Sequence, residues 1–131
     1  MTQFLGKWNF VSVENLDVFM DSLGTKPEVR EFMQNTNPDM EYSQEGDEWV
    51  MTIHIPGSTK VTKFKLGEPF DNTTLDGMPV KSTVTLKDNK LSETYSADNG
   101  KVDLTREVNG NQLISIAWHN DVKCTWIHNK A

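Results

Sequence analysis

The sequence predicts a single, mostly β domain in which about ten short strands follow one another as an antiparallel meander. Turn signals recur along the whole chain, such as Glu45-Gly46, Asp88-Asn89 and Asn109-Gly110, and these pairs supply the backbone angles that tight turns require. The segments between the turns are short and evenly spaced. Within most of them apolar and polar residues alternate, as on a strand with one buried face.

Ten segments fit this description, and no low-complexity linker separates them, so residues 1–131 are expected to form one domain. Segment 112–119 is ambiguous, because Ile114 and Trp118 lie on one face of a strand and Leu113 and Ala117 on the other. The expected strands are 4–13, 38–45, 48–55, 59–66, 70–74, 79–87, 90–97, 101–109, 112–119 and 122–129.

Residues 15–36 interrupt the pattern and predict two short amphipathic helices. Apolar residues at 16, 19, 20 and 23 recur at helical spacing, with Asn15 as the expected N-cap and Gly24 as the expected stop. The segment from Thr25 to Glu28 resembles a capping box with Pro27 near the first helical position, and apolar residues follow at 29, 32 and 33. Both apolar stripes need a surface to cover, and the mouth of a curved sheet would provide one.

Several polar residues interrupt faces that are otherwise apolar. Arg106 and Glu93 each lie between two apolar residues on the face expected to point inward, and Thr62, Ser82 and His128 share the inner face of their strands. An unpaired charge in a dry core costs several kcal/mol (order of magnitude), so the two charges must either pair in a packed core or meet water. We favour a barrel with a wet internal cavity, because ten strands enclose more room than the eight or so that just suffice for a filled interior.

Composition and charge argue against several classes of protein. The chain has 13 Lys and Arg against 19 Asp and Glu, a formal charge of −6, which disfavours nucleic-acid binding. The single cysteine, Cys124, excludes an internal disulfide and a zinc site built from cysteines. Neither a signal peptide nor an apolar stretch of about 18 residues is found, so we expect a cytoplasmic protein.

An enzyme is the alternative from another class. Cys124 and His128 share a face, but four residues at about 3.3 Å rise place them about 13 Å apart, too far for a nucleophile and its base. The three histidines, His54, His119 and His128, lack the spacing of metal ligands. We therefore expect no catalytic residues, no metal and no cofactor. A β domain with a filled core, acting through protein contacts, is the other alternative.

A set of short motifs spread over the whole chain resembles the intracellular lipid-binding proteins, and most closely their fatty-acid-binding branch. The resemblance implies a ten-stranded up-and-down barrel, flattened like a clam and capped by a helix-turn-helix over about residues 15–36, with the ligand held in an internal cavity. The motifs are Phe4-Leu5-Gly6-Lys7-Trp8, Asn15-Leu16-Asp17-Val18-Phe19-Met20, Phe64-Lys65-Leu66-Gly67-Glu68, Phe70-Asp71, Val80-Lys81-Ser82, Thr105-Arg106-Glu107-Val108-Asn109-Gly110 and Val122-Lys123-Cys124-Thr125.

The same resemblance implies a monomeric cytosolic carrier of long-chain fatty acids, with retinoids or other lipids as the alternative ligands. An acyl chain of ~16 carbons, at about 0.8 kcal/mol for each buried methylene, supplies ample binding energy, so the head-group contact mainly sets orientation and selectivity. Lys26 and Arg30 near the cap are expected to make at most transient contact with anionic membranes.

In the fatty-acid branch, two cavity arginines and a tyrosine commonly hold the ligand carboxylate. Arg106 matches the first arginine, but the Arg-x-Tyr motif of the last strand here reads Trp126-Ile127-His128. We expect Arg106 to pair with the carboxylate, which one arginine can do unaided. His128 is expected to replace the tyrosine as a second head-group contact, with Trp126 beside it.

The correspondence also predicts the wall and portal of the cavity, where soft apolar side chains would suit an adaptable acyl chain. Gly57, at a position where many relatives carry a bulky residue, would widen the gate. Glu93 and Tyr95 join the wall because they share the inner face of their strand. The full set is Leu16, Met20, Val29, Met33, Ile53, Gly57, Leu75, Asp76, Met78, Glu93, Tyr95, Leu104 and Ala117.

Overall fold

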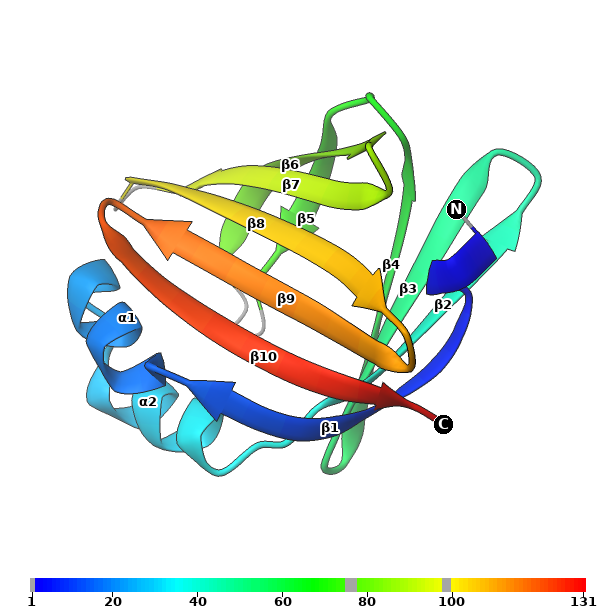
Figure 1. Cartoon of the computed structure of the whole chain (residues 1–131). Helices are drawn as coiled ribbons and strands as arrows, with labels where there is room; N and C mark the ends of the chain where they lie inside the picture. Colours follow the sequence, from blue (N-terminus) through cyan, green and yellow to red (C-terminus); the bar gives the residue numbers. More distant parts are fainter. Residues whose placement is uncertain (1, 75–77, 98–99) are drawn as a thin grey trace.

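Ten antiparallel strands curve into a nearly closed barrel, with two helices at one end (Figure 1). The computed structural model describes residues 2–74, 78–97 and 100–131. A short 3-10 helix, Thr2–Phe4, precedes the first strand, and the helices α1 (Leu16–Leu23) and α2 (Pro27–Gln34) follow it. The strands are β1 (Gly6–Glu14), β2 (Asp39–Glu45), β3 (Glu48–Ile55), β4 (Ser58–Lys65), β5 (Phe70–Thr73), β6 (Pro79–Lys87), β7 (Lys90–Ala97), β8 (Gly100–Asn109), β9 (Gln112–His119) and β10 (Val122–Lys130).

The sheet has the predicted up-and-down topology. Its strand order is β4-β3-β2-β1-β10-β9-β8-β7-β6-β5, so β1 pairs with β10 and all other pairs are neighbours in sequence. The tight turns adopt the positive φ angles that their residues favour, as at Gly46 (65°), Asn89 (64°) and Gly110 (63°). The edge strands β4 and β5 follow one another in the chain, but no backbone pairing joins them in the described residues. The barrel is therefore completed there by side chains.

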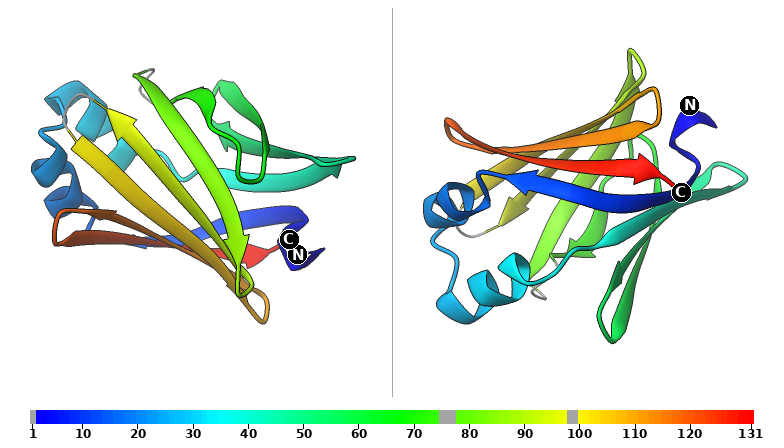
Figure 2. Two further views of the ribbon diagram at one scale, coloured as in Figure 1. Left: turned by 90° about the horizontal axis from the view of Figure 1, so that it is seen from above. Right: turned by 60° about the horizontal axis from the view of Figure 1, so that its bottom comes forward.

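The two helices lie together across one end of the barrel (Figure 2). Gly24 ends α1 as predicted, in the left-handed conformation (φ 66°), and Pro27 occupies the first turn of α2. Asn15 occupies the N-cap position of α1 as predicted, but neither helix has a side-chain capping bond. Asn15 is itself left-handed (φ 67°) and donates its side-chain amide to the Lys123 carbonyl on β10 (2.8 Å). Lys26, rather than Thr25, precedes α2, and its side chain makes no capping bond.

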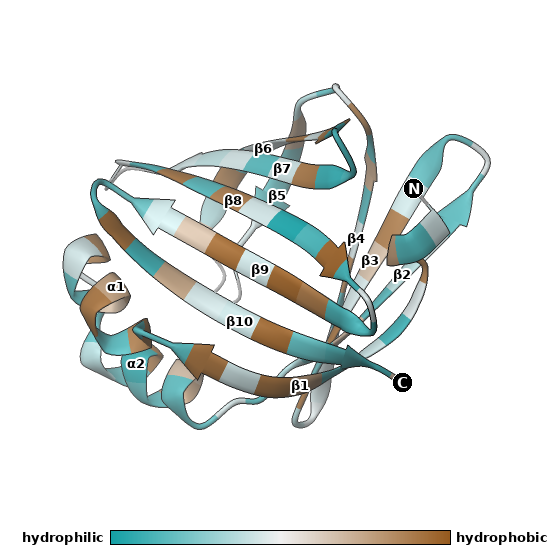
Figure 3. Cartoon of the chain, viewed as in Figure 1, coloured by the Kyte–Doolittle hydropathy of each residue, from teal (hydrophilic) through white to brown (hydrophobic). Residues whose placement is uncertain are grey.

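The apolar side chains form two clusters that leave room between them, and the alternation of apolar and polar residues along the strands is visible in Figure 3. The larger cluster is built on aromatic residues of β1 to β4, among them the fully buried Trp8 and Trp49. The smaller one gathers Phe19 of α1 with Val102 and Cys124 beneath the helices.

The ambiguous strand, β9, turns Leu113, Ser115, Ala117 and His119 inward, whereas Trp118 is exposed. This orientation places the smaller side chains of β9 inside the barrel, where they add little bulk to its interior.

Neither α1 nor α2, at eight residues each, has the length of an apolar helix that spans a bilayer.

Candidate functional site

A cavity of about 670 Å³ lies inside the barrel beneath α1 and α2. Its volume falls within the roughly 300–1,000 Å³ that is typical of small-molecule sites, and apolar side chains form most of its wall. Leu75 and Asp76, which were predicted to lie at the portal, are outside the described residues. The predicted wall and portal residues that do line the cavity are Leu16, Met20, Val29, Met33, Ile53, Met78, Glu93, Tyr95, Leu104 and Ala117.

Gly57 does not line this cavity. It lies in the exposed turn between β3 and β4, where its φ of 75° serves the turn. A side chain at this position would project from the hairpin tip, since no atom lies within 4 Å of the Cβ it would add. The predicted widening of the gate by Gly57 therefore finds no support in the cavity lining.

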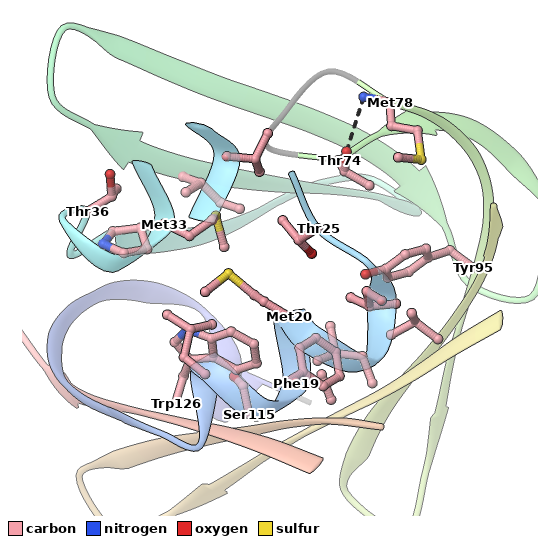
Figure 4. A pocket seen from close by; sticks show the side chains of 18 of the residues that line it. Phe19, Met20, Thr25, Met33, Thr36, Thr74, Met78, Tyr95, Ser115 and Trp126 are labelled. Carbon is pink, nitrogen blue, oxygen red and sulfur yellow. Dashed lines mark hydrogen bonds between the residues drawn. The ribbon is translucent and has the colours of Figure 1, made fainter. Parts of the chain in front are cut away.

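Flexible side chains dominate the helical side of the cavity. Met20 of α1 and Met33 of α2 point toward one another across it, with Met78 and Tyr95 farther round the wall (Figure 4). The backbone N–H of Met78 donates to the Thr74 hydroxyl (3.1 Å), which holds the start of β6 against the end of β5. Thioether side chains can repack around ligands of different shape.

A charged pair stands on the wall where the sequence placed two inward-facing charges. Nη1 of Arg106 lies 3.4 Å from Oε1 of Glu93, and the two side chains are only 12% and 10% exposed. Burial by itself would lower the pKa of Arg106, but the nearby Tyr42 and Glu93 raise it, so the guanidinium stays charged. The two charges therefore pair with each other, but they do so on the wall of a cavity and not inside a packed core.

Three buried polar atoms have no hydrogen-bond partner among the described residues: Nε of Arg106, Oγ of Ser115 and Nδ1 of His128. All three residues line the cavity. Arg106 and Ser115 face each other in the β8–β9 pair, and His128 pairs with Leu113, two residues along β9 from Ser115. Buried polar groups are nearly always satisfied, so these atoms form a polar pole suited to water or to the polar end of a ligand.

The ring of His128 is held in one orientation. Its Nε2 lies 2.9 Å from the carbonyl of Pro38, which can only accept, so Nε2 carries the proton and Nδ1 of the neutral ring is an acceptor. Burial lowers the pKa of His128, and the positive charge of Arg106 acts in the same direction, against the Pro38 carbonyl and Asp39. The histidine is therefore neutral near pH 7 in the empty cavity.

Trp126 occupies the part of the wall nearest the helices. Its ring meets Phe19 of α1 edge-on, with ring centroids 6.4 Å apart. In the β9–β10 pair it faces Ser115, so it borders the polar pole on its helical side. The indole therefore fills space beneath α1, at the position where the family resemblance implies a second arginine.

Three further residues of the site were not singled out by the sequence. Ser115 was hidden by the ambiguous faces of its strand, and Tyr42 shares a strand face with the apolar Met40, as an ordinary core residue would. The Tyr42 phenol lies beside Arg106, and burial raises its pKa although the guanidinium acts to lower it. Lys60 lines the cavity from β4. It shares the inner face of Thr62 and Phe64, so the alternation along β4 could have revealed it.

The Cys124 thiol is buried, and the possible metal ligands of the described residues do not gather in one place. Cys124 is fully buried, and burial raises the pKa of its thiol to about 12, which suppresses the reactive thiolate. No cluster of three or more possible metal ligands occurs within residues 2–74, 78–97 and 100–131.

Comparison with known proteins matches residues 5–125 to the model of the lipocalin / cytosolic fatty-acid binding protein family. Fatty acid-binding protein 5 of Pygoscelis papua is 33% identical over 129 residues, covering 98% of this chain and 96% of that protein. A fatty acid-binding protein of Clonorchis sinensis is 30% identical over 124 residues, covering 93% of each chain. The fatty acid binding protein of Schistosoma mansoni, solved in complex with arachidonic acid, superposes with a TM-score of 0.95 at 29% identity, covering 100% of this chain and 98% of that one.

Proposed function

The chain belongs to the lipocalin / cytosolic fatty-acid binding protein family, and from this we propose that it binds a long-chain fatty acid, or a similar amphipathic lipid, inside the barrel and carries it through the cytosol. The single observation that carries this proposal is the cavity, which combines a mainly apolar wall with one polar pole. Such a cavity matches a molecule with one long apolar part and one polar end. The names of the relatives support the same ligand class.

The polar end of the ligand is proposed to lie against Arg106, Ser115 and His128. A carboxylate there would receive hydrogen bonds from the unpartnered Nε of Arg106 and from the Ser115 hydroxyl. It would also compete with Glu93 for the same guanidinium. Trp126 would border the head group on the side of α1.

The family consists of carrier proteins, and we propose that this chain is a monomeric carrier rather than an enzyme. The buried, weakly acidic thiol of Cys124 supports this proposal. A retinoid or another lipid is the alternative cargo. Contact of the cap with anionic membranes stays a prediction, and Arg30 is already paired with Asp21 of α1.

Delipidated protein is expected to bind a long-chain fatty acid saturably, with one or two molecules in each barrel. Titration calorimetry and native mass spectrometry would measure the affinity and the stoichiometry, with retinol and a fluorescent lipid probe titrated in parallel. Binding of retinol but not of fatty acid would transfer the proposal to the alternative cargo. Saturable binding of none of these ligands would contradict it.

Binding of a fatty acid is expected to take up a proton at His128 near neutral pH. The pKa of this histidine is lowered in the empty cavity, and a carboxylate near Nδ1 would stabilise the protonated ring and raise the pKa again. Affinity for the acid should therefore increase as the pH falls toward the ordinary value of about 6.5.

Calorimetry in two buffers with different ionisation enthalpies measures this proton uptake directly. His128→Gln should remove it, and the Gln variant also corrects for the titration of the fatty acid itself. The same proton uptake in both proteins would show that His128 packs against Phe10 and Pro38 without meeting the head group.

A further inference from the structure

The cavity contains a second cation, Lys60, on a different strand from the residues of the polar pole. Lys60 stands on the inner face of the edge strand β4, and its half-buried side chain lines the cavity. Its Nζ donates to the hydroxyl of Thr62 (3.0 Å) and to the side-chain carbonyl of Asn72 on β5 (3.1 Å). These bonds connect the two edge strands of the sheet, which no backbone pairing joins in the described residues.

A row of polar side chains crosses five strands of the wall, and Lys60 is its last member. The row starts with Arg106 on β8 and Glu93 on β7, 3.4 Å apart. Glu93 faces Val84 of β6, two residues from Ser82. The hydroxyl of Ser82 accepts a bond from Asn72 of β5 (3.3 Å), which in turn accepts from Lys60 of β4. Three strands separate the two cations, so they would contact different parts of one ligand.

The charges of the described lining residues match one carboxylate on the ligand and no more. Lys26 and Glu28 are exposed at the helices and offset each other, and His128 is neutral near pH 7. Among the described residues that line the inside of the barrel, the two cations Arg106 and Lys60 are accompanied by one carboxylate, that of Glu93. One positive charge is left over, which a single acidic head group neutralises. A second acidic group on the ligand would leave an excess of negative charge in the cavity.

Lys60 has one hydrogen-bond donor to spare. An ammonium group has three N–H donors, and the two acceptors found for Nζ among the described residues, Thr62 and Asn72, use two of them. Burial also lowers the pKa of Lys60, so a further acceptor would favour its charged form. An uncharged oxygen on the ligand meets both requirements, since it accepts a hydrogen bond without adding charge.

We propose that Lys60 is a second binding position in the cavity and that the preferred cargo is a long-chain acid with an additional oxygen, as a hydroxyl or keto group, on its chain. The inference rests on the proposed function, since it assumes that the acid group binds at the Arg106 pole. The chain of the acid would then run along the apolar wall, and its second oxygen would accept the third N–H of Lys60. Ile53 faces Lys60 in the β3–β4 pair and provides apolar contact beside this position.

The test compares stearic acid with stearic acids that carry a hydroxyl in mid-chain or at the terminal carbon. We expect the wild-type protein to bind at least one hydroxy acid about tenfold more tightly than stearic acid, as for a hydrogen bond to a charged group. Lys60→Met should abolish this preference, so that the binding of the hydroxy acid weakens about tenfold more than the binding of stearic acid. Lys60→Gln, which keeps a side-chain donor toward Asn72, should reduce the preference and serves as the second variant if Lys60→Met fails to fold.

Lys63→Met is the matched control. Lys63 lies on the same strand, and its replacement removes the same charge, but its side chain is exposed on the outer face. The preference for the hydroxy acid should therefore be unchanged. A purely structural role of Lys60 would weaken the binding of all three acids equally and overturn the inference. So would a wild-type protein that binds stearic acid as tightly as every hydroxy acid. Failure of the wild-type protein to bind any of the acids would overturn the proposed function as well.

Discussion

Replacing Trp49 by alanine is expected to lower the free energy of unfolding by about 3–5 kcal/mol, as for the loss of a large aromatic side chain from a core. The indole is fully buried. It stacks on Phe64 of β4 with ring centroids 6.3 Å apart, and Phe64 stacks on Phe70 of β5 at 5.6 Å. The stack therefore crosses from β4 to β5, where no backbone pairing in the described residues closes the barrel. Equilibrium denaturation followed by circular dichroism would measure the loss.

Trp118→Ala provides the matched control for this prediction. Its side chain is 39% exposed on the outer face of β9, where Lys123 Nζ lies 5.5 Å from the ring centroid. An exposed contact of this kind contributes about 0.5–1 kcal/mol, so the control should cost no more than that. Losses of equal size in the two variants would show that the aromatic stack does not hold β4 against β5.

The strands could be predicted closely because their ends are set by local turn chemistry. Nine of the ten strands begin and end within one residue of the expected positions. The larger error is at the start of β1, where residues 2–4 form a 3-10 turn that brings Phe4 into the core. The side-chain capping bonds are absent for a different reason. Asn15 is at the N-cap position, but its side-chain amide bonds to a strand more than 100 residues away.

Only the part of the binding site that follows from the alternation of residues along the strands could be predicted. Alternation placed Arg106, Glu93 and His128 on inner faces, and all three line the cavity. It cannot say which polar atoms will find partners, because this depends on contacts between distant segments such as Pro38 and His128. Alternation also places Lys60 on the inner face of β4, but no local pattern encodes its bond to Asn72 on the other edge strand.

Replacing Arg106 by glutamine is expected to weaken the binding of a fatty acid by about 1.5–3 kcal/mol, as for a hydrogen bond to a charged group. The same substitution should hardly affect the methyl ester of that acid, since the ester has no charge for the guanidinium to neutralise. Titration calorimetry of the acid and the ester against both proteins measures the difference. Equal losses for acid and ester would show that Arg106 acts only through the structure of the cavity.

Glu93→Gln supplies the opposite test on the same ion pair. Glu93 is the counter-ion of Arg106 in the empty cavity, 3.4 Å away, so a bound carboxylate must displace or share it. The glutamine variant should therefore bind the acid more tightly than the wild-type protein, while its empty form is less stable because the buried guanidinium has lost its partner. The ester should again show little change. If Glu93→Gln instead weakened binding of the acid as Arg106→Gln does, the carboxylate could not be competing with Glu93, and the head group would have to lie elsewhere in the cavity.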